Sequence, residues 1–322
     1  RASAAGLTFG AGLAVALTAA SLPLAAARYG WGRSYGLVTQ GVPGWLADVG
    51  KGAAIQVVVL GGVGAALAVM VRRLPRTWWV GLSGLTVALA YGLTMLSPVV
   101  VEPLFQKTHP LADAALEREI LDTARRVGVE AKDVVVNDAS RRTTTANAYV
   151  SGLGASRHIV LFDTLLRDFP RDQVVAVAAH ELAHAERRHV LKGATWGAAL
   201  AVPACLLVFA AVGWRTGFGR PGPGAAGTDL VVRRVAVAAA TAVALSAASA
   251  PLGNWVSRAM EREADWVAVR ATGDVPAAVG LQTGLVARNL GVPDPPAWVR
   301  WWFGTHPDAL QRIGLALRAG RG

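Results

Sequence analysis

A chain of 322 residues that is 53% hydrophobic and only 16% charged is too apolar for an ordinary soluble domain, in which about 25% of residues are charged. The single cysteine, Cys205, excludes a disulfide framework and a thiolate metal site. The net charge of +11 comes mainly from arginines scattered through loops, without a basic stripe or an aromatic RNA-binding motif. We therefore interpret it as loop charge beside anionic lipid, and expect no nucleic-acid partner.

Five runs without Asp, Glu, Lys, Arg or His are long enough to cross a bilayer as helices. They are Ala4–Ala27, Gly52–Val71, Thr77–Val101, Gly193–Trp214 and Val235–Ser257. A buried helix of a soluble protein seldom stays uncharged over such a length, so we predict a mainly α, polytopic membrane protein with at least five transmembrane helices. The first run is too long for a signal peptide and lacks a basic stretch before it. Because the chain starts at Arg1 rather than Met, we expect it to be truncated upstream.

The spans divide the chain into four parts. These are an N-terminal membrane region (1–101), a polar insert (102–192), two further spans (193–257) and a C-terminal part (258–322). Counting spans places the connector Arg28–Lys51, the insert and the C-terminal part on one side of the membrane. Eleven Lys and Arg residues near span ends on that side, against seven on the other, favour a cytoplasmic insert, although the compact loop Arg72–Arg76 argues the other way. The preference for Arg over Lys suggests a GC-rich bacterial genome, and so the inner membrane.

The insert combines helical and strand patterns. Apolar residues recur at helical spacing from about Leu111, which predicts an amphipathic helix. Asp168 with Pro170 predicts the cap and first turn of a second helix. Three short β-rich runs predict strands at Asp133–Asp138, Asn147–Gly152 and His158–Asp163. We therefore expect an α+β domain inserted between spans.

The second helix carries "HELAH", residues 180 to 184, which fits the pattern H-E-x-x-H. His180 and His184 are four residues apart, so their imidazoles lie one turn above the other and can bind one zinc ion. Glu181 on the adjacent flank can accept a proton from a water molecule that the zinc activates. A polar helix end at the membrane surface is the simpler alternative, but the pattern is too specific to favour it.

A catalytic zinc needs a third protein ligand. His189 is five residues past His184, or about 140° further round a continuous helix, so we expect it to face away as an interfacial side chain. His109 and His158 are expected to be surface or strand residues.

The acidic run "MEREAD", residues 260 to 265, is a better source of the third ligand. Glu261 and Asp265 share a helix face. Glu261 can bind zinc, and Asp265 can hydrogen-bond the second nitrogen of a ligand histidine. From spacing alone Glu263 competes for the ligand role, and a plain salt-bridged helix is also possible.

"HELAH" followed by "MEREAD" resembles the integral-membrane zinc metallopeptidases that comprise the CAAX prenyl protease 1 homologues and the HtpX-like proteases. The similarity extends to "SPVVVEPLFQKTHPL", to "NAYVSGLGASRHIVLFDTLL" and to "THPDALQRI". The Gly-Trp-Gly connector near Arg33 is similar to a loop of the CAAX protease branch, which HtpX-like proteins lack.

The resemblance implies a zincin-like metalloprotease domain of the gluzincin type, with one zinc ion per chain. Glu261 would be the third zinc ligand, and Asp265 would be the acid that hydrogen-bonds a ligand histidine. The resemblance therefore disfavours Glu263 as the third ligand. His306 and Arg312 would lie near the reacting carbonyl and steady its oxyanion. The strand containing Asn147, Ala148 and Tyr149 would hold the substrate backbone by strand addition. For both groups a purely structural role is the alternative.

The predicted function is thus a zinc-dependent membrane endopeptidase with its active site facing the cytoplasm, acting on membrane-associated or lipidated (CAAX-type) proteins or peptides. Quality-control cleavage of membrane proteins, as by HtpX-like proteases, is the main alternative. A catalytically inactive scaffold is less favoured because all three ligands and the base are present. A transporter is disfavoured because the spans contain no Asp, Glu, Lys, Arg or His.

Overall fold

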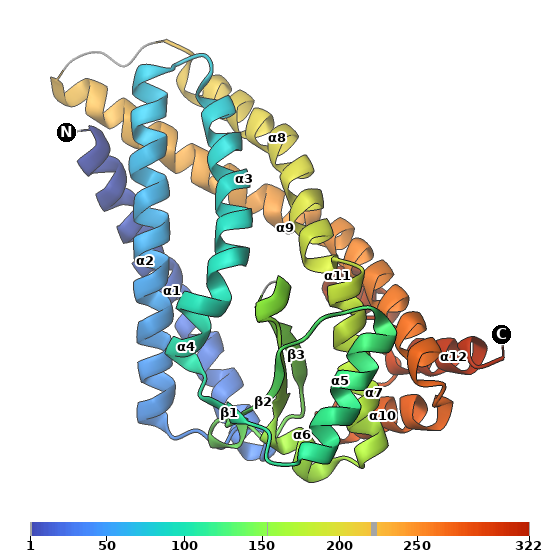
Figure 1. Ribbon diagram of the computed structural model, residues 1–322. Helices are drawn as coiled ribbons and strands as arrows, with labels where there is room; N and C mark the ends of the chain where they lie inside the picture. The colour runs from blue at the N-terminus through green and yellow to red at the C-terminus, as the bar shows by residue number, and fades with distance from the viewer. Residues whose placement is uncertain (1, 153, 220–223, 322) are drawn as a thin grey trace. The chain divides into compact units, whose positions relative to one another are not determined.

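The structure, a computed structural model, describes residues 2–152, 154–219 and 224–321 (Figure 1). It forms two compact units. Unit 1 comprises Arg1–Trp31, Gly41–Leu93 and Ala194–Ser249, and unit 2 comprises Gly32–Gln40, Thr94–Gly193 and Ala250–Gly322. Each unit therefore draws on segments that lie far apart in the sequence.

Long apolar helices dominate unit 1. Within the described residues, five helices are long and apolar enough to cross a membrane, which confirms the predicted number of spans. They lie in α1 (Ala2–Ser34), α2 (Val42–Arg73), α3 (Trp78–Leu96) with its helical continuation to Phe105, α8 (His189–Thr216) and α9 (Gly224–Thr272). A helix is favoured in lipid because it satisfies its backbone hydrogen bonds internally. Most of these helices are longer than the uncharged runs, because the charged residues that flank each run belong to the same helix.

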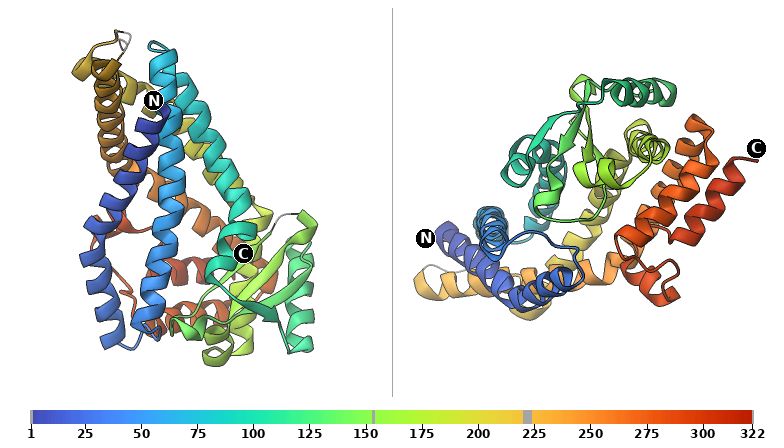
Figure 2. Two further views of the ribbon diagram at one scale, coloured as in Figure 1. Left: turned by 90° about the vertical axis from the view of Figure 1, so that its left-hand side faces the viewer. Right: turned by 90° about the horizontal axis from the view of Figure 1, so that it is seen from below.

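Small residues allow α1 and α2 to pack closely near the start of α1 (Figure 2). A Cβ atom added at Gly6 would lie 2.3 Å from the carbonyl oxygen of Gly64, and one at Gly10 would lie 2.1 Å from that of Leu60. The two backbones are therefore in contact, as small residues permit between membrane helices.

Unit 2 contains a four-stranded sheet with the order β1-β2-β4-β3. The strands are β1 (Thr108–Pro110), β2 (Asp133–Asn137), β3 (Ala148–Ser151) and β4 (His158–Phe162). β2 and β4 run parallel, while β1 and β3 pair antiparallel with their neighbours. Among the described residues β3 pairs with β4 alone, so it is an edge strand whose outer side can accept a further strand.

Helices pack against this sheet and against one another. α5 (Ala114–Val127) and α7 (Arg171–Glu186) share a buried apolar core with β2 and β4. α10 (Val275–Arg288) and α12 (Ala309–Ala319) lie side by side (Figure 2). The remaining helices of unit 2 are the π-helix η1 (Ser97–Val101), α4 (Glu102–Phe105), the short 3-10 helices η2 (Ala139–Arg141) and η3 (Gly154–Ser156), α6 (Asp163–Asp168) and α11 (Ala297–Phe303).

Several predicted boundaries need correction. The amphipathic helix begins at Ala114 rather than near Leu111, because the Asp113 side chain caps it by accepting hydrogen bonds from the amides of Ala115 and Leu116. Each of the three strands is one or two residues shorter than predicted. Asp168 does not cap α7: it ends the unpredicted helix α6 and pairs with Arg288 at 2.5 Å.

The connector between the first two spans belongs in part to unit 2. Val38 forms an isolated β-bridge with Thr143, and the Thr144 hydroxyl donates to the carbonyl of Gly36 at 2.8 Å. These contacts join residues more than 100 positions apart, so no local sequence pattern predicts them.

Candidate metal centre

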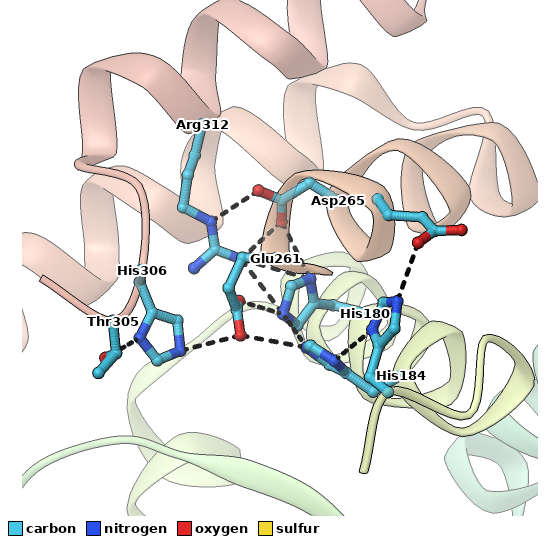
Figure 3. Close-up of polar contacts among 9 residues, drawn as sticks. His180, His184, Glu261, Asp265, Thr305, His306 and Arg312 are labelled. Atoms are coloured by element: carbon cyan, nitrogen blue, oxygen red, sulfur yellow. Dashed lines mark hydrogen bonds and ion pairs between the residues drawn. The ribbon is translucent and has the colours of Figure 1, made fainter. Parts of the chain in front are cut away.

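Two helices of unit 2 bring the predicted metal ligands together (Figure 3). α7 carries His180 and His184, and α9 carries Glu261. One ligand atom from each of these three residues lies within 4.8 Å of the others. The i, i+4 spacing in α7 places both imidazoles on the side that faces α9.

The donor atoms converge on one point. Nε2 of His180 lies 3.1 Å from Nε2 of His184 and 3.2 Å from Oε2 of Glu261. Nε2 of His184 lies 3.4 Å from Oε1 of Glu261. Glu261 is only 6% exposed, and its Oε2 atom is buried without a hydrogen bond from the described residues. Leaving a buried carboxylate oxygen without a donor is costly, and a cation between these three groups removes that cost.

Asp265 and Arg312 support His180 from behind. Nδ1 of His180 lies 2.9 Å from Oδ1 of Asp265, and the Arg312 guanidinium binds both oxygens of Asp265, at 2.5 and 2.8 Å. Burial and the Arg312 charge lower the pKa of His180, but the neighbouring carboxylates of Asp265 and Glu261 outweigh them and raise this pKa to about 9. The protonated form of His180 is therefore favoured at neutral pH unless a cation binds this imidazole.

The position of His189 contradicts the prediction that this side chain faces away from the cluster. It is 4% exposed rather than interfacial, and its Nδ1 lies 2.9 Å from Nδ1 of His184. The assumption of one continuous helix fails, because α7 ends at Glu186 and Arg188 adopts a left-handed φ of 53° before α8 begins at His189. The turn redirects the His189 side chain onto the back of His184.

Glu263 lies behind His189 rather than at the metal position. Its Oε2 atom is 3.1 Å from Nε2 of His189 and 3.6 Å from Nζ of Lys192. The geometry therefore assigns the two competing glutamates of "MEREAD" to different histidines. Glu261 contacts His180 and His184, whereas Glu263 reaches His184 only through His189.

His306 lies on the open side of the cluster. Its Nε2 is 3.2 Å from Oε1 of Glu261, and its Nδ1 is 2.8 Å from the hydroxyl of Thr305 (Figure 3). Burial lowers the pKa of His306, which favours its neutral form. Its side chain is 57% exposed, whereas that of Arg312 is 12% exposed and bound to Asp265. Of these two residues His306 is thus the one more open to a substrate.

A cavity of about 430 Å³ opens beside the cluster. Its lining includes Glu181 and His184 from α7, and Tyr149 and Val150 from the edge strand β3. Burial raises the pKa of Glu181, which strengthens this carboxylate as a proton acceptor. The cavity therefore brings a buried carboxylate, a histidine of the candidate metal cluster and the edge strand β3 around one space.

Polar residues that the sequence did not single out support this strand. The Tyr149 hydroxyl and the Asn137 amide both bind Oε1 of Gln106, and the Ser151 hydroxyl donates to Glu102 at 2.9 Å. Burial and the Glu102 charge raise the pKa of Tyr149 to about 12, so its hydroxyl stays protonated. Ala148 is buried, while Asn147 is exposed just before β3. Of the three predicted substrate-binding residues, only Tyr149 lines the cavity.

The fold and the cluster define an integral-membrane protein with a His-Glu-x-x-His helix and a glutamate from a second helix at one candidate metal site. Residues 110–319 match peptidase family M48, and residues 4–107 match the family described as CAAX prenyl protease N-terminal, five membrane helices. The chain belongs to peptidase family M48. This confirms the family predicted from "HELAH" and "MEREAD", and membership implies a metal cofactor.

Relatives and a solved structure agree with this assignment. The chain is 31% identical over 253 residues to the uncharacterized metalloprotease YhfN of Bacillus subtilis, covering 76% of this chain and 57% of that protein. It is 41% identical over 95 residues to CAAX prenyl protease 1 of Saccharomyces cerevisiae, covering 29% of this chain and 21% of that protein. The crystal structure of S. mikatae Ste24p matches with a TM-score of 0.83 at 22% identity, over 94% of this chain and 74% of that one. The fold is therefore shared, although the chain spans little more than half the length of YhfN.

Proposed function

We propose that the chain is a zinc-dependent endopeptidase that cleaves membrane-associated proteins or peptides, including lipidated substrates of the CAAX type. The observation that carries the proposal is the convergent set His180, His184 and Glu261, with a buried oxygen of Glu261 that receives no hydrogen bond from the described residues, beside a cavity that Glu181 also lines. Family membership and the relatives named CAAX prenyl protease 1 support it.

The donor set fits zinc. Two imidazole nitrogens and one carboxylate are the protein ligands of many catalytic zinc sites, which keep a further position open. His180, His184 and Glu261 would hold the ion. When bound, zinc would polarise the scissile carbonyl and acidify the attacking water molecule.

Three residues around the site would then have distinct roles in the reaction. Glu181 would take the proton of the attacking water and deliver it to the leaving amine, because it lines the cavity and burial raises its pKa. His306, at the open side of the cluster, would donate a hydrogen bond to the developing oxyanion. The contacts of Arg312 favour a positioning role, in which it holds Asp265 and thereby orients His180.

The substrate backbone would add to the edge strand β3. β3 pairs with β4 on one side only, and Tyr149 and Val150 face the same cavity as Glu181. An extended peptide can bind such an edge by main-chain hydrogen bonds, while adjacent cavities select its side chains. We propose that residues 147–149 contribute mainly through backbone, since Asn147 is exposed and Ala148 is buried.

We further propose the bacterial inner membrane as the location, with the cavity on the cytoplasmic side. The excess of Lys and Arg near span ends on the side of the insert supports this orientation.

A cleavage assay on matched peptides tests the proposal. Purified chain should cleave a peptide with a prenylated C-terminal cysteine motif, and a metal chelator should stop the reaction. Equal cleavage of the unprenylated peptide would indicate general membrane-protein quality control instead. No cleavage of either peptide or of an unfolded membrane protein by zinc-loaded chain would contradict the peptidase proposal and favour an inactive scaffold.

Zinc affinity should rise with pH. Because the pKa of His180 in the metal-free protein is about 9, this imidazole is protonated at neutral pH and zinc must displace its proton. Loss of one proton on binding corresponds to about a tenfold gain in affinity per pH unit below that pKa. Competition with a zinc chelator between pH 6 and pH 9 measures the slope, and a pH-independent affinity would show that no proton is displaced.

His189 and Glu263 should orient His184. If Nε2 of His184 held the ion, the neutral His184 ring would carry its proton on Nδ1 and donate it to Nδ1 of His189, which would in turn donate from Nε2 to Glu263. His189→Ala should therefore weaken zinc binding by about 10–100-fold, as for other outer partners of metal ligands.

Glu263→Gln should weaken zinc binding less than His189→Ala, because an amide oxygen can still accept from His189. Glu186→Gln is the matched control, since both glutamates pair with Arg187 but only Glu263 contacts His189. Equal zinc affinities for His189→Ala and Glu186→Gln would overturn this role.

A further inference from the structure

Unit 2 contains a second concave site, whose residues are separate from the metal cluster. It is an open groove of about 570 Å³ between α9 and α11. Its lining combines cationic and aromatic side chains: Arg258 and Arg262 from α9, and Trp298, Arg300 and Trp301 from α11, with Ala297 and Gln311. Neither the metal nor the proposed peptide site accounts for this combination.

Arg258 is a buried charge without a counter-ion. It is 8% exposed, and its Nη1 donates to the carbonyl oxygens of Arg300 and Gly304, at 3.0 and 2.6 Å. Among the described residues no carboxylate lies within ion-pair distance of Arg258 or of the exposed Arg262. A guanidinium keeps its charge in proteins, and a buried charge is costly unless it is paired. An anion in the groove would supply the missing partner.

Arg300, unlike Arg258 and Arg262, is paired with carboxylates. Its Nη1 pairs with Asp308 at 2.6 Å and with Asp294 at 3.4 Å. Asp294 and Asp308 are thus engaged by Arg300, and the two guanidiniums from α9 are left to attract an external anion.

The aromatic side of the groove is exposed. Trp298 is 65% exposed and Trp301 is 54% exposed, although both are large apolar side chains. Trp302 and Phe303 of the same short helix are exposed too. Tryptophans with one apolar and one polar end are typical of the membrane–water interface, where acyl chains meet headgroups.

The position of Arg258 along α9 identifies the kind of anion. It is the first charged residue after the uncharged run Val235–Ser257 of the same helix, and Trp255, one turn earlier, is 56% exposed. The end of a membrane span lies at the depth of the lipid headgroups. An acidic peptide from solution would have to enter that layer, whereas a phospholipid already resides in it.

We propose that Arg258, Arg262, Trp298 and Trp301 form a binding site for one anionic phospholipid. The guanidiniums bind the headgroup phosphate by charge-assisted hydrogen bonds, and the two tryptophans contact the glycerol and upper acyl region. A net-negative lipid is preferred over a zwitterionic one, because the choline of the latter would be repelled by the same guanidiniums.

Native mass spectrometry of the full chain in detergent tests this site, with phosphatidylglycerol and phosphatidylcholine as competing probes. The parent should retain phosphatidylglycerol preferentially. Each guanidinium removed should weaken that binding by about fivefold, so Arg262→Gln should lose about fivefold and Arg258→Gln with Arg262→Gln clearly more. Arg270→Gln is the matched control, because Arg270 is an exposed arginine of α9 outside the groove.

Several outcomes would overturn the proposal. They are unchanged binding in the Arg262→Gln variant, equal retention of both lipids by the parent, and displacement of phosphatidylglycerol by an equal concentration of inorganic phosphate. Arg262→Gln keeps the test valid if replacing the buried Arg258 prevents folding, and Arg258→Lys retains the charge there. The readout is lipid binding, so it is independent of whether the chain cleaves peptides.

Discussion

Glu181→Gln should lower kcat by about 10²–10⁴-fold, the usual contribution of a general acid–base group, while the zinc content stays at the parent level. The amide cannot accept the proton of the attacking water, yet Glu181 is not among the three residues whose donor atoms converge. Peptide turnover and zinc analysis on the same preparation measure both quantities.

Glu186→Gln is a suitable control for this prediction, because Glu186 lies in the same helix and does not line the cavity. A Glu181→Gln variant that cleaves at the parent rate would show that another group accepts the proton. A variant that loses its zinc would instead indicate a structural role for Glu181.

Glu261→Gln should abolish activity by removing zinc. The carboxylate is buried between both histidines, and its charge offsets that of the cation. Loss of a residue that only hydrogen-bonds a ligand weakens metal binding by about 10–100-fold, and replacing this carboxylate by an amide should reduce zinc affinity by more than that. Zinc content after dialysis, together with turnover at saturating zinc, measures the loss.

The matched comparison is Glu263→Gln, two residues away on the same helix. Spacing alone left either glutamate as the third ligand, and the contacts distinguish them: Glu261 faces His180 and His184, and Glu263 faces His189. We expect the order of zinc affinities to be parent, then Glu263→Gln, then Glu261→Gln. The reverse order of the two variants would assign the ligand to Glu263.

Patterns within one element were predictable from the sequence. The five spans follow from uninterrupted apolar composition, and the pair His180 and His184 follows from helical periodicity within α7. Both predictions depend only on residues that are neighbours along the chain, so they do not depend on how the rest of the molecule folds.

Features that depend on chain breaks or distant contacts were not predictable. His189 was misplaced because extrapolation at 100° per residue ignores the left-handed turn at Arg188. The packing of the connector near Val38 against Thr143 joins segments that no local pattern relates. The groove of Arg258 and Trp298 likewise forms only when α11 folds back beside α9.

A zinc titration of the metal-depleted chain, followed by peptide cleavage, tests the proposed zinc peptidase activity most directly. Activity should be absent without metal, rise in proportion to added zinc, and saturate at one equivalent per chain. Substantial cleavage by the metal-free chain, or none at full zinc occupancy of His180, His184 and Glu261, would contradict the proposal.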